Sequence, residues 1–296
     1  MICRPKVVVA LALGLVASSG FSAEPSATGL TAQQVIERIQ KQTGLAWGGP
    51  TVDTFKAGDP QTPVTGIAVT MMATLDVLQR SAAAGANLII THEPTFYGHY
   101  DLPENLEAEK DPVLAAKRDF IKAHGLVIWR FHDHIHQLKP DMIAAGVIKA
   151  LDWRKFQPDV NQHVFVIPET TLEQLAAQIK TRLGIRTLRV VGDPKLKVTK
   201  VGLSPGFSGF DANRKLLQSD EVEVLLLGEA HEWETIEYGA DAVAAGKRKA
   251  LIVLGHIPSE EAGMKECTAW LKTFVTEVPV QFVVTPEPFW APREAH

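Results

Sequence analysis

The stretch Leu88-Ile89-Ile90-Thr91-His92-Glu93-Pro94 joins a fully apolar run to an imidazole and a carboxylate placed side by side. A short, continuous apolar run is typical of a strand in a parallel sheet that helices cover on both faces. A second stretch repeats this design, because the apolar run Leu251-Ile252-Val253-Leu254 is followed by Gly255-His256-Ile257-Pro258-Ser259-Glu260. Two predicted strands therefore end in His-x-Pro, and this shared ending suggests two similar halves.

The segments around both stretches predict alternating strands and helices. In the first half we expect a strand over Val64–Thr70, a helix over Thr74–Ala84 that closes at Gly85, and a strand over Leu88–Thr91. In the second half we expect a strand over Val222–Glu229, a helix over Trp233–Ala245 and a strand over Ala250–Leu254. Strand, helix and strand with short links form a βαβ unit. The sequence thus predicts an α/β fold of two lobes, over residues 24–160 and 161–296.

Composition limits the possible partners. The chain has 296 residues, of which 46% are hydrophobic and 22% are charged, so it is long enough and apolar enough for a globular fold. Its formal net charge is -4, and its lysines and arginines are scattered. Nucleic acid is therefore excluded as an expected partner, because phosphate binding needs clustered cations. We expect a small-molecule substrate instead.

The N-terminal segment predicts export. Arg4 and Lys6 precede an apolar run from Val7 to Ala17, and small residues follow up to Ala23. This order is typical of a secretory signal peptide over residues 1–23, and the run is too short to span a bilayer. We expect a periplasmic or secreted protein with no stable membrane insertion after cleavage. Removal of this segment leaves Cys267 as a single cysteine, which its helical surroundings predict to be buried.

Potential metal ligands follow three predicted strands. They are His92 with Glu93, the tract His132-Asp133-His134-Ile135-His136 after the strand Leu126–Phe131, and His256 with Glu260. Ligands of open α/β sheets bind beyond the carboxyl ends of the strands, so these side chains are expected at one site. Imidazole with carboxylate favours zinc, iron or manganese over calcium or magnesium. If the strand continued, His132, His134 and His136 would share one face; in a loop this alternation would not hold.

These motifs resemble the Nif-three-like family of dinuclear metal proteins, also known as GTP cyclohydrolase I type 2 homologues. The resemblance covers most of the chain after residue 23 and is carried by Ala86–Pro94, the strand ending at His132, Leu227–His231 and Gly255–Glu260. It implies two similar α/β lobes with a metal-binding cleft between them. It also implies two divalent transition metals in each subunit and a homo-oligomer, a toroidal hexamer.

Two positions depart from the family pattern. The family motif His-His-Pro is here His92-Glu93-Pro94, and the family motif His-x-x-x-Asp here ends in His136. The third motif, Gly-His-x-x-(Ser/Thr)-Glu, is intact. The implied metal ligands His92, Glu93, His136, His256 and Glu260 still provide three imidazoles and two carboxylates. A competing assignment uses Asp133 in place of His136.

Two adjacent ions of this kind activate water, which predicts a metal-dependent hydrolase of unknown substrate. We expect His132, Asp133 and Glu229 to act as general acids or bases, or to orient the metal ligands. The alternative is a non-catalytic metal-binding or scaffold protein of the same fold. Against a nucleoside triphosphate as substrate, the sequence contains neither a glycine-rich phosphate loop nor an arginine cluster.

Overall fold

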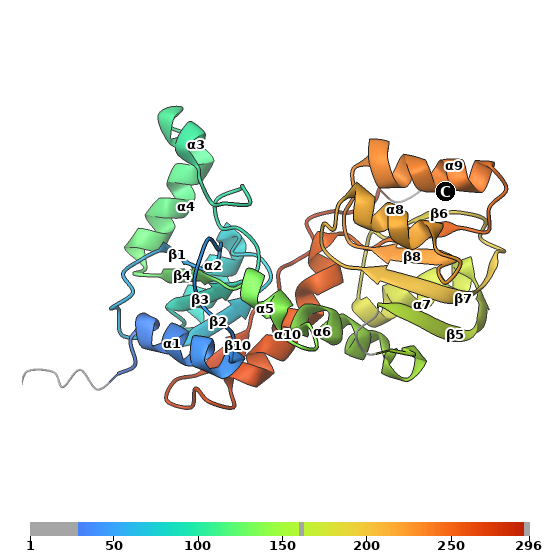
Figure 1. Cartoon of the computed structure of the whole chain (residues 1–296). Helices are drawn as coiled ribbons and strands as arrows, with labels where there is room; N and C mark the ends of the chain where they lie inside the picture. Colours follow the sequence, from blue (N-terminus) through green and yellow to red (C-terminus); the bar gives the residue numbers. More distant parts are fainter. Residues whose placement is uncertain (1–28, 160–162, 293–296) are drawn as a thin grey trace, which may run out of the picture.

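The structure is a computed structural model that describes residues 29–159 and 163–292. The predicted signal segment, residues 1–23, lies outside the described residues. Within the described part of the chain, every helix is too short or too polar to cross a membrane. Two lobes, each built on one five-stranded sheet, lie on either side of a central group of helices (Figure 1).

The first lobe contains the sheet β1-β4-β3-β2-β10. Its strands are β1 (Phe55–Ala57), β2 (Ile67–Thr70), β3 (Leu88–Thr91), β4 (Val127–Arg130) and β10 (Val280–Phe282). Its helices are α1 (Ala32–Thr43), α2 (Leu75–Ala83), α3 (Glu104–Ala108) and α4 (Pro112–Ala123). Every residue of β2, β3 and β4 is buried, as the continuous apolar runs predicted. These three strands are parallel, so their carboxyl ends meet at one edge of the sheet.

The second lobe repeats this arrangement with the sheet β5-β7-β8-β9-β6. Its strands are β5 (Val164–Thr171), β6 (Arg189–Val191), β7 (Lys197–Ser204), β8 (Val224–Leu227) and β9 (Ala250–Val253). Its helices are α7 (Leu172–Leu183), α8 (Phe210–Gln218), the π-helix η2 (Glu232–Ile236) and α9 (Glu237–Ala244). The 3-10 helix η1 (Arg154–Phe156) precedes β5. Strands β7, β8 and β9 are parallel, which confirms the predicted α/β fold of two similar lobes.

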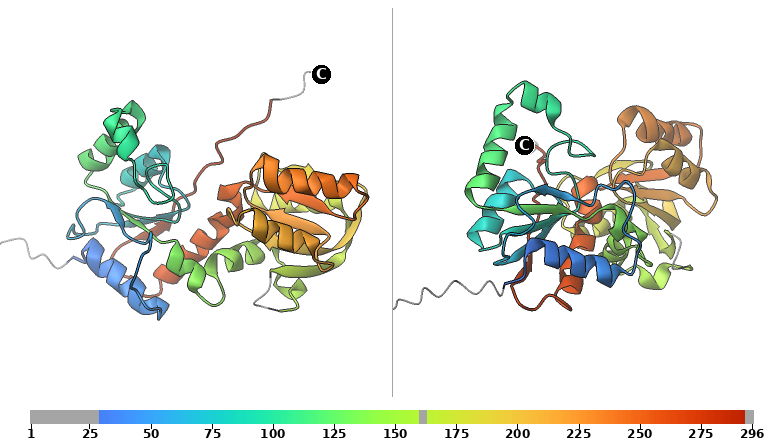
Figure 2. Two further views of the ribbon diagram at one scale, coloured as in Figure 1. Left: turned by 45° about the horizontal axis from the view of Figure 1, so that its top comes forward. Right: turned by 60° about the vertical axis from the view of Figure 1, so that its left-hand side comes forward.

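Three helices lie between the lobes: α5 (Asp133–Gln137), α6 (Met142–Leu151) and α10 (His256–Leu271) (Figures 1 and 2). Helices α6 and α10 cross where Gly146 meets Gly263. A Cβ atom on Gly146 would lie only 2.5 Å from the Gly263 backbone, so the crossing requires glycine. This close packing holds α10, which carries His256, against α6, which follows the helix α5 that carries His136.

The end of the chain returns to the first lobe. Strand β10 pairs in parallel with β2, and Val280 lies opposite Ile67. Residues 161–296 were expected to form the second lobe, but β10 lies in the sheet of the first lobe. The physical reason is that α10 buries Met264 and Cys267 in the core of the first lobe, which brings the following strand to β2. Cys267 is fully buried, as predicted.

Candidate metal centre

His92 and Glu93 follow β3 directly and are held inside the first lobe. The His92 side chain is fully buried, and its Nδ1 donates to the backbone carbonyl of Phe131 over 3.0 Å. This hydrogen bond fixes the ring and leaves Nε2 as the potential metal ligand. Glu93 is also buried, and its Oε2 lies 3.3 Å from Nη2 of the fully buried Arg130.

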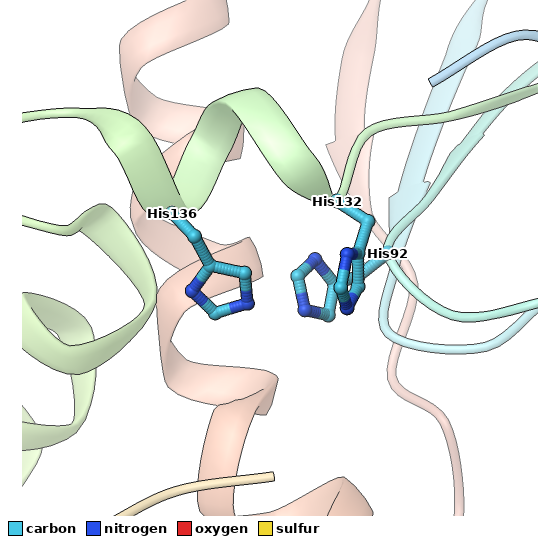
Figure 3. Close-up of side chains that lie close together, drawn as sticks. All are labelled: His92, His132 and His136. Atoms are coloured by element: carbon cyan, nitrogen blue, oxygen red, sulfur yellow. The ribbon is translucent and has the colours of Figure 1, made fainter. Parts of the chain in front are cut away.

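His132 and His136 lie on one side of the short helix α5. Their ring centroids are 5.1 Å apart and lie 4.7 and 5.1 Å, respectively, from the centroid of His92 (Figure 3). Nδ1 of His132 is 2.9 Å from Asp133 Oδ1, and Nδ1 of His136 is 2.9 Å from Asp141 Oδ2. Each ring therefore has a carboxylate that sets its orientation, and the three histidines form a group that could hold a metal ion.

A second group joins the two lobes. It consists of His92, Glu93 and Glu260, with His256 in contact with both carboxylates. His256 Nε2 lies 3.1 Å from Glu93 Oε1 and 3.2 Å from Glu260 Oε2. His256 and Glu260 are four residues apart in the first turns of α10, so they share one face of the helix, as the His-x-x-x-Glu spacing predicted. Glu229, which follows β8, holds Nδ1 of His256 over 2.9 Å.

Two buried atoms at this site lack hydrogen-bond partners within the described residues: Nε2 of His92 and Oε2 of Glu260. They lie 3.5 Å apart. Buried polar atoms in native proteins are nearly always satisfied, and an unsatisfied nitrogen facing an unsatisfied carboxylate oxygen is what a bound cation would explain. The residues present therefore fit a transition metal.

The loop after β7 makes room for Glu260. Gly206 has a left-handed backbone, with φ of +62°, and a side chain there would overlap the Glu260 carboxylate. The Gly206 amide donates to Ser259 Oγ over 2.9 Å, which ties the loop to the first turn of α10. The sequence predicted a loop here but gave it no role at the site.

The electrostatics of the site favour a positive charge. Burial alone would lower the pKa of His256, but the surrounding carboxylates of Glu229, Glu260 and Glu93 raise the pKa to about 12. Burial would raise the pKa of Glu93, but the hydrogen bond from His256 and the charge of His92 lower it to about 2. Three carboxylates thus surround one imidazole. In contrast, burial lowers the pKa of His132 to about 4, which keeps this ring neutral and able to bind a metal.

The structure brings all five predicted metal ligands together and adds His132 to them. His132 was predicted to be catalytic or orienting, yet its Nε2 lies 3.7 Å from Glu93 Oε1. Asp133, the competing ligand, lies outside both groups. Its Oδ2 accepts hydrogen bonds from Thr51 Oγ1 and the Val52 amide over 2.8 and 3.0 Å, and its Oδ1 contacts His132.

The histidine-rich tract is helical rather than extended. Strand β4 ends at Arg130, and Asp53 accepts hydrogen bonds from the backbone amides of residues 132, 133 and 134. His134 consequently turns away from the site, where its Nδ1 contacts Asp53 Oδ2 over 2.7 Å and its ring stacks on Trp47. The sequence left a continued strand and a loop open for this tract, and the structure has a short helix instead, for this reason. Asp53 lies far upstream in the sequence and gave no local signal.

The fold and the site together define a two-lobed α/β protein with a candidate His/Glu metal centre where the lobes meet. The chain belongs to the Duf34/NIF3 (NGG1p interacting factor 3) family, whose model matches residues 51–288. The resemblance inferred from the His92 and His256 motifs is thereby confirmed.

Solved structures show the same fold. A Bacillus cereus protein related to NIF3 is 15% identical, with a TM-score of 0.67, and the match covers 89% of this chain and 99% of that one. Staphylococcus aureus protein SA1388 is 15% identical, with a TM-score of 0.64 and coverage of 89% and 99%. Reduced HcgD from Methanocaldococcus jannaschii is 15% identical, with a TM-score of 0.60 and coverage of 86% and 98%. No curated protein matches this sequence.

Proposed function

We propose that this protein is a metal-dependent hydrolase whose dinuclear centre holds two divalent transition metals of the zinc, iron or manganese type. The observation that carries the proposal is the pair of unsatisfied buried atoms, His92 Nε2 and Glu260 Oε2, which face each other 3.5 Å apart. When bound, two such ions would supply a Lewis acid and lower the pKa of water, which makes hydrolysis possible at neutral pH.

The number of ligands supports two ions rather than one. Four imidazoles and two carboxylates surround the site, whereas a single zinc ion usually takes four ligands. Glu93 Oε1 lies near Nε2 of both His132 and His256, at 3.7 and 3.1 Å. Glu260 Oε2 lies near Nε2 of both His92 and His256, at 3.5 and 3.2 Å. Each carboxylate oxygen thus lies between two imidazoles, as a shared ligand would.

The protein's own contribution is to orient these ligands and to move protons. Asp133, Asp141 and Glu229 each hold Nδ1 of one histidine, which fixes the ring that binds the metal. Among these, the Glu229 side chain is the most exposed, with 55% accessible to solvent. We therefore assign Glu229 the further role of carrying the proton between the site and solvent during hydrolysis of a small-molecule substrate.

The proposal includes export and self-association. The N-terminal segment supports a periplasmic or secreted protein, and the family resemblance supports a homo-oligomer, a hexamer. Fractionation of a full-length tagged protein tests the location, since a protein found only in the cytoplasm would contradict it. Light scattering of the purified protein tests the assembly, and a monomer would contradict that part.

The function is tested by metal analysis and a hydrolase screen. Wild-type protein, after dialysis, should contain about two metals per chain, and His256→Ala should lose metal and activity on esters, amides or phosphodiesters. His124→Ala is the matched control, because His124 is exposed and stacks on Phe120, outside both ligand groups. Fewer than about one metal per chain would contradict the dinuclear centre. Stoichiometric metal without any turnover, but with unfolding on its removal, would favour the scaffold function instead.

A further inference from the structure

The second lobe exposes three aromatic side chains beside the metal centre. Phe207, His231 and Trp233 form this group, called here the aromatic platform, and Trp233 has 71% of its surface exposed. The rings of His231 and Trp233 stack at 4.5 Å with only 15° between their planes. The ring centroid of Phe207 lies 5.1 Å from that of His231. So much exposed aromatic surface beside a polar site indicates a binding surface.

The platform is adjacent to the metal centre through two short links. His231 follows Glu229 by two residues, and Glu229 contacts His256 over 2.9 Å. Two residues of extended chain span at most about 7 Å. Phe207 follows Gly206, whose backbone packs against the Glu260 carboxylate. A ligand on the platform can therefore reach the metal ligands with an adjoining group.

The platform is held in place by the structure beneath it. Nδ1 of His231 contacts Glu234 Oε2 over 3.1 Å, which sets the orientation of the ring. Trp233 lies in the π-helix η2, and π-helical turns often occur at functional sites. The same turn is anchored by the buried Thr235, whose hydroxyl accepts a hydrogen bond from Asn213. The stacked rings are thus preformed, which reduces the entropy lost on binding.

The charges around the platform select against anions. Glu229, Glu232 and Glu234 lie in the same segment; Glu232 pairs with Arg189 at 2.7 Å, and Glu229 and Glu234 each contact one histidine, at 2.9 and 3.1 Å. Carboxylates at this density repel phosphate or carboxylate groups placed over the rings. The stacked imidazole and indole instead favour a flat, uncharged ring.

We propose that the aromatic platform binds a flat, uncharged aromatic ring of the substrate and so directs the hydrolysable group toward the metal centre. Only the second part of this proposal, that the bound ring directs a hydrolysable group toward the metal centre, rests on the proposed hydrolase function. Binding of the ring can be measured without turnover, so the two proposals can fail separately.

The test is calorimetric titration of the metal-loaded full chain with 2-naphthamide, a flat uncharged probe, and with cyclohexanecarboxamide, its non-aromatic counterpart. We expect Trp233→Ala to weaken 2-naphthamide binding by about tenfold, in line with the usual effect of removing one stacking ring. Trp290→Ala is the matched control, because Trp290 is equally exposed, at 74%, but lies in the C-terminal segment. It should bind 2-naphthamide like the wild type.

Several results would overturn the inference. The inference is wrong if Trp233→Ala and wild type bind 2-naphthamide with equal affinity, or if Trp290→Ala loses as much affinity as Trp233→Ala. It is also wrong if the wild type binds 2-naphthamide and cyclohexanecarboxamide equally well. A change of oligomeric state in Trp233→Ala would also overturn it, since the platform would then be a contact between copies of the chain. Because Trp233 is exposed, thermal melting should confirm that the variant is folded. If 2-naphthamide binds as expected but no aryl ester or amide is hydrolysed, the platform stands and the hydrolase function fails.

Discussion

The buried pair Glu93–Arg130 gives the sharpest test of how the altered metal centre is built. Glu93 Oε2 lies 3.3 Å from Arg130 Nη2, and the exposed fractions of the two side chains are 9% and 0%. Neutralising Glu93 leaves the Arg130 guanidinium buried without its counter-charge. Removal of one partner of a buried ion pair costs about 3–5 kcal/mol. We expect Glu93→Gln to lower the free energy of unfolding by an amount near the lower end of this range, because the amide can still accept a hydrogen bond.

The assay is urea unfolding of the metal-free, EDTA-treated protein, so that lost metal binding does not add to the effect. Arg130→Met should also destabilise, and the double variant should lose less than the sum of the two single variants. Glu107→Gln is the control, because Glu107 pairs with Arg118 at the surface, where a salt bridge contributes about 0–1 kcal/mol. The buried pair does not stabilise the site if Glu93→Gln lowers the free energy of unfolding no more than Glu107→Gln does. The same conclusion follows if the loss in the double variant equals the sum of the losses in the two single variants.

Three further predictions concern the rest of the molecule. Burial raises the pKa of the Cys267 thiol to about 12, so Cys267 should resist iodoacetamide at pH 8 in native protein and react in urea. Gly146→Ala should destabilise by about 1–3 kcal/mol through overpacking against α10, whereas Gly48→Ala, with open space around it, should not. Burial lowers the pKa of Lys117 to about 8. Between about pH 8 and 10.5 the unfolded chain therefore binds more protons than the folded protein, so the free energy of unfolding should rise with pH in that window. Lys117→Met should abolish this rise.

The sequence predicted the main strands and the positions of His92 and His256 because these features are local. Apolar runs such as Leu88–Ile90 form buried parallel strands, and the residues that follow them must lie at the carboxyl edge of the sheet. The His-x-x-x-Glu spacing likewise fixes one helix face for His256 and Glu260. Each of these inferences needs only a few neighbouring residues.

The features that the sequence did not predict depend on contacts between distant segments. Asp53 accepts hydrogen bonds from backbone amides about eighty residues further along the chain, just after β4 and at the start of α5. These bonds turn the chain so that His132 rather than Asp133 faces the metal centre. The return of β10 to the first sheet depends on where α10 buries its apolar face. Local pattern cannot determine either, because both result from tertiary packing.

The two departures from the family pattern are each matched by a specific partner in the structure. Glu93, where the pattern has histidine, contacts the buried Arg130, and His136, where the pattern has aspartate, contacts Asp141. A site that had merely lost its ligands would leave such substitutions without dedicated partners, since buried charge is costly unless it is paired. Here the carboxylate at position 93 is fixed by a cation and the imidazole at position 136 by an anion. The exchange of the two ligand types therefore preserves an ordered site, and the metal proposal depends on that order.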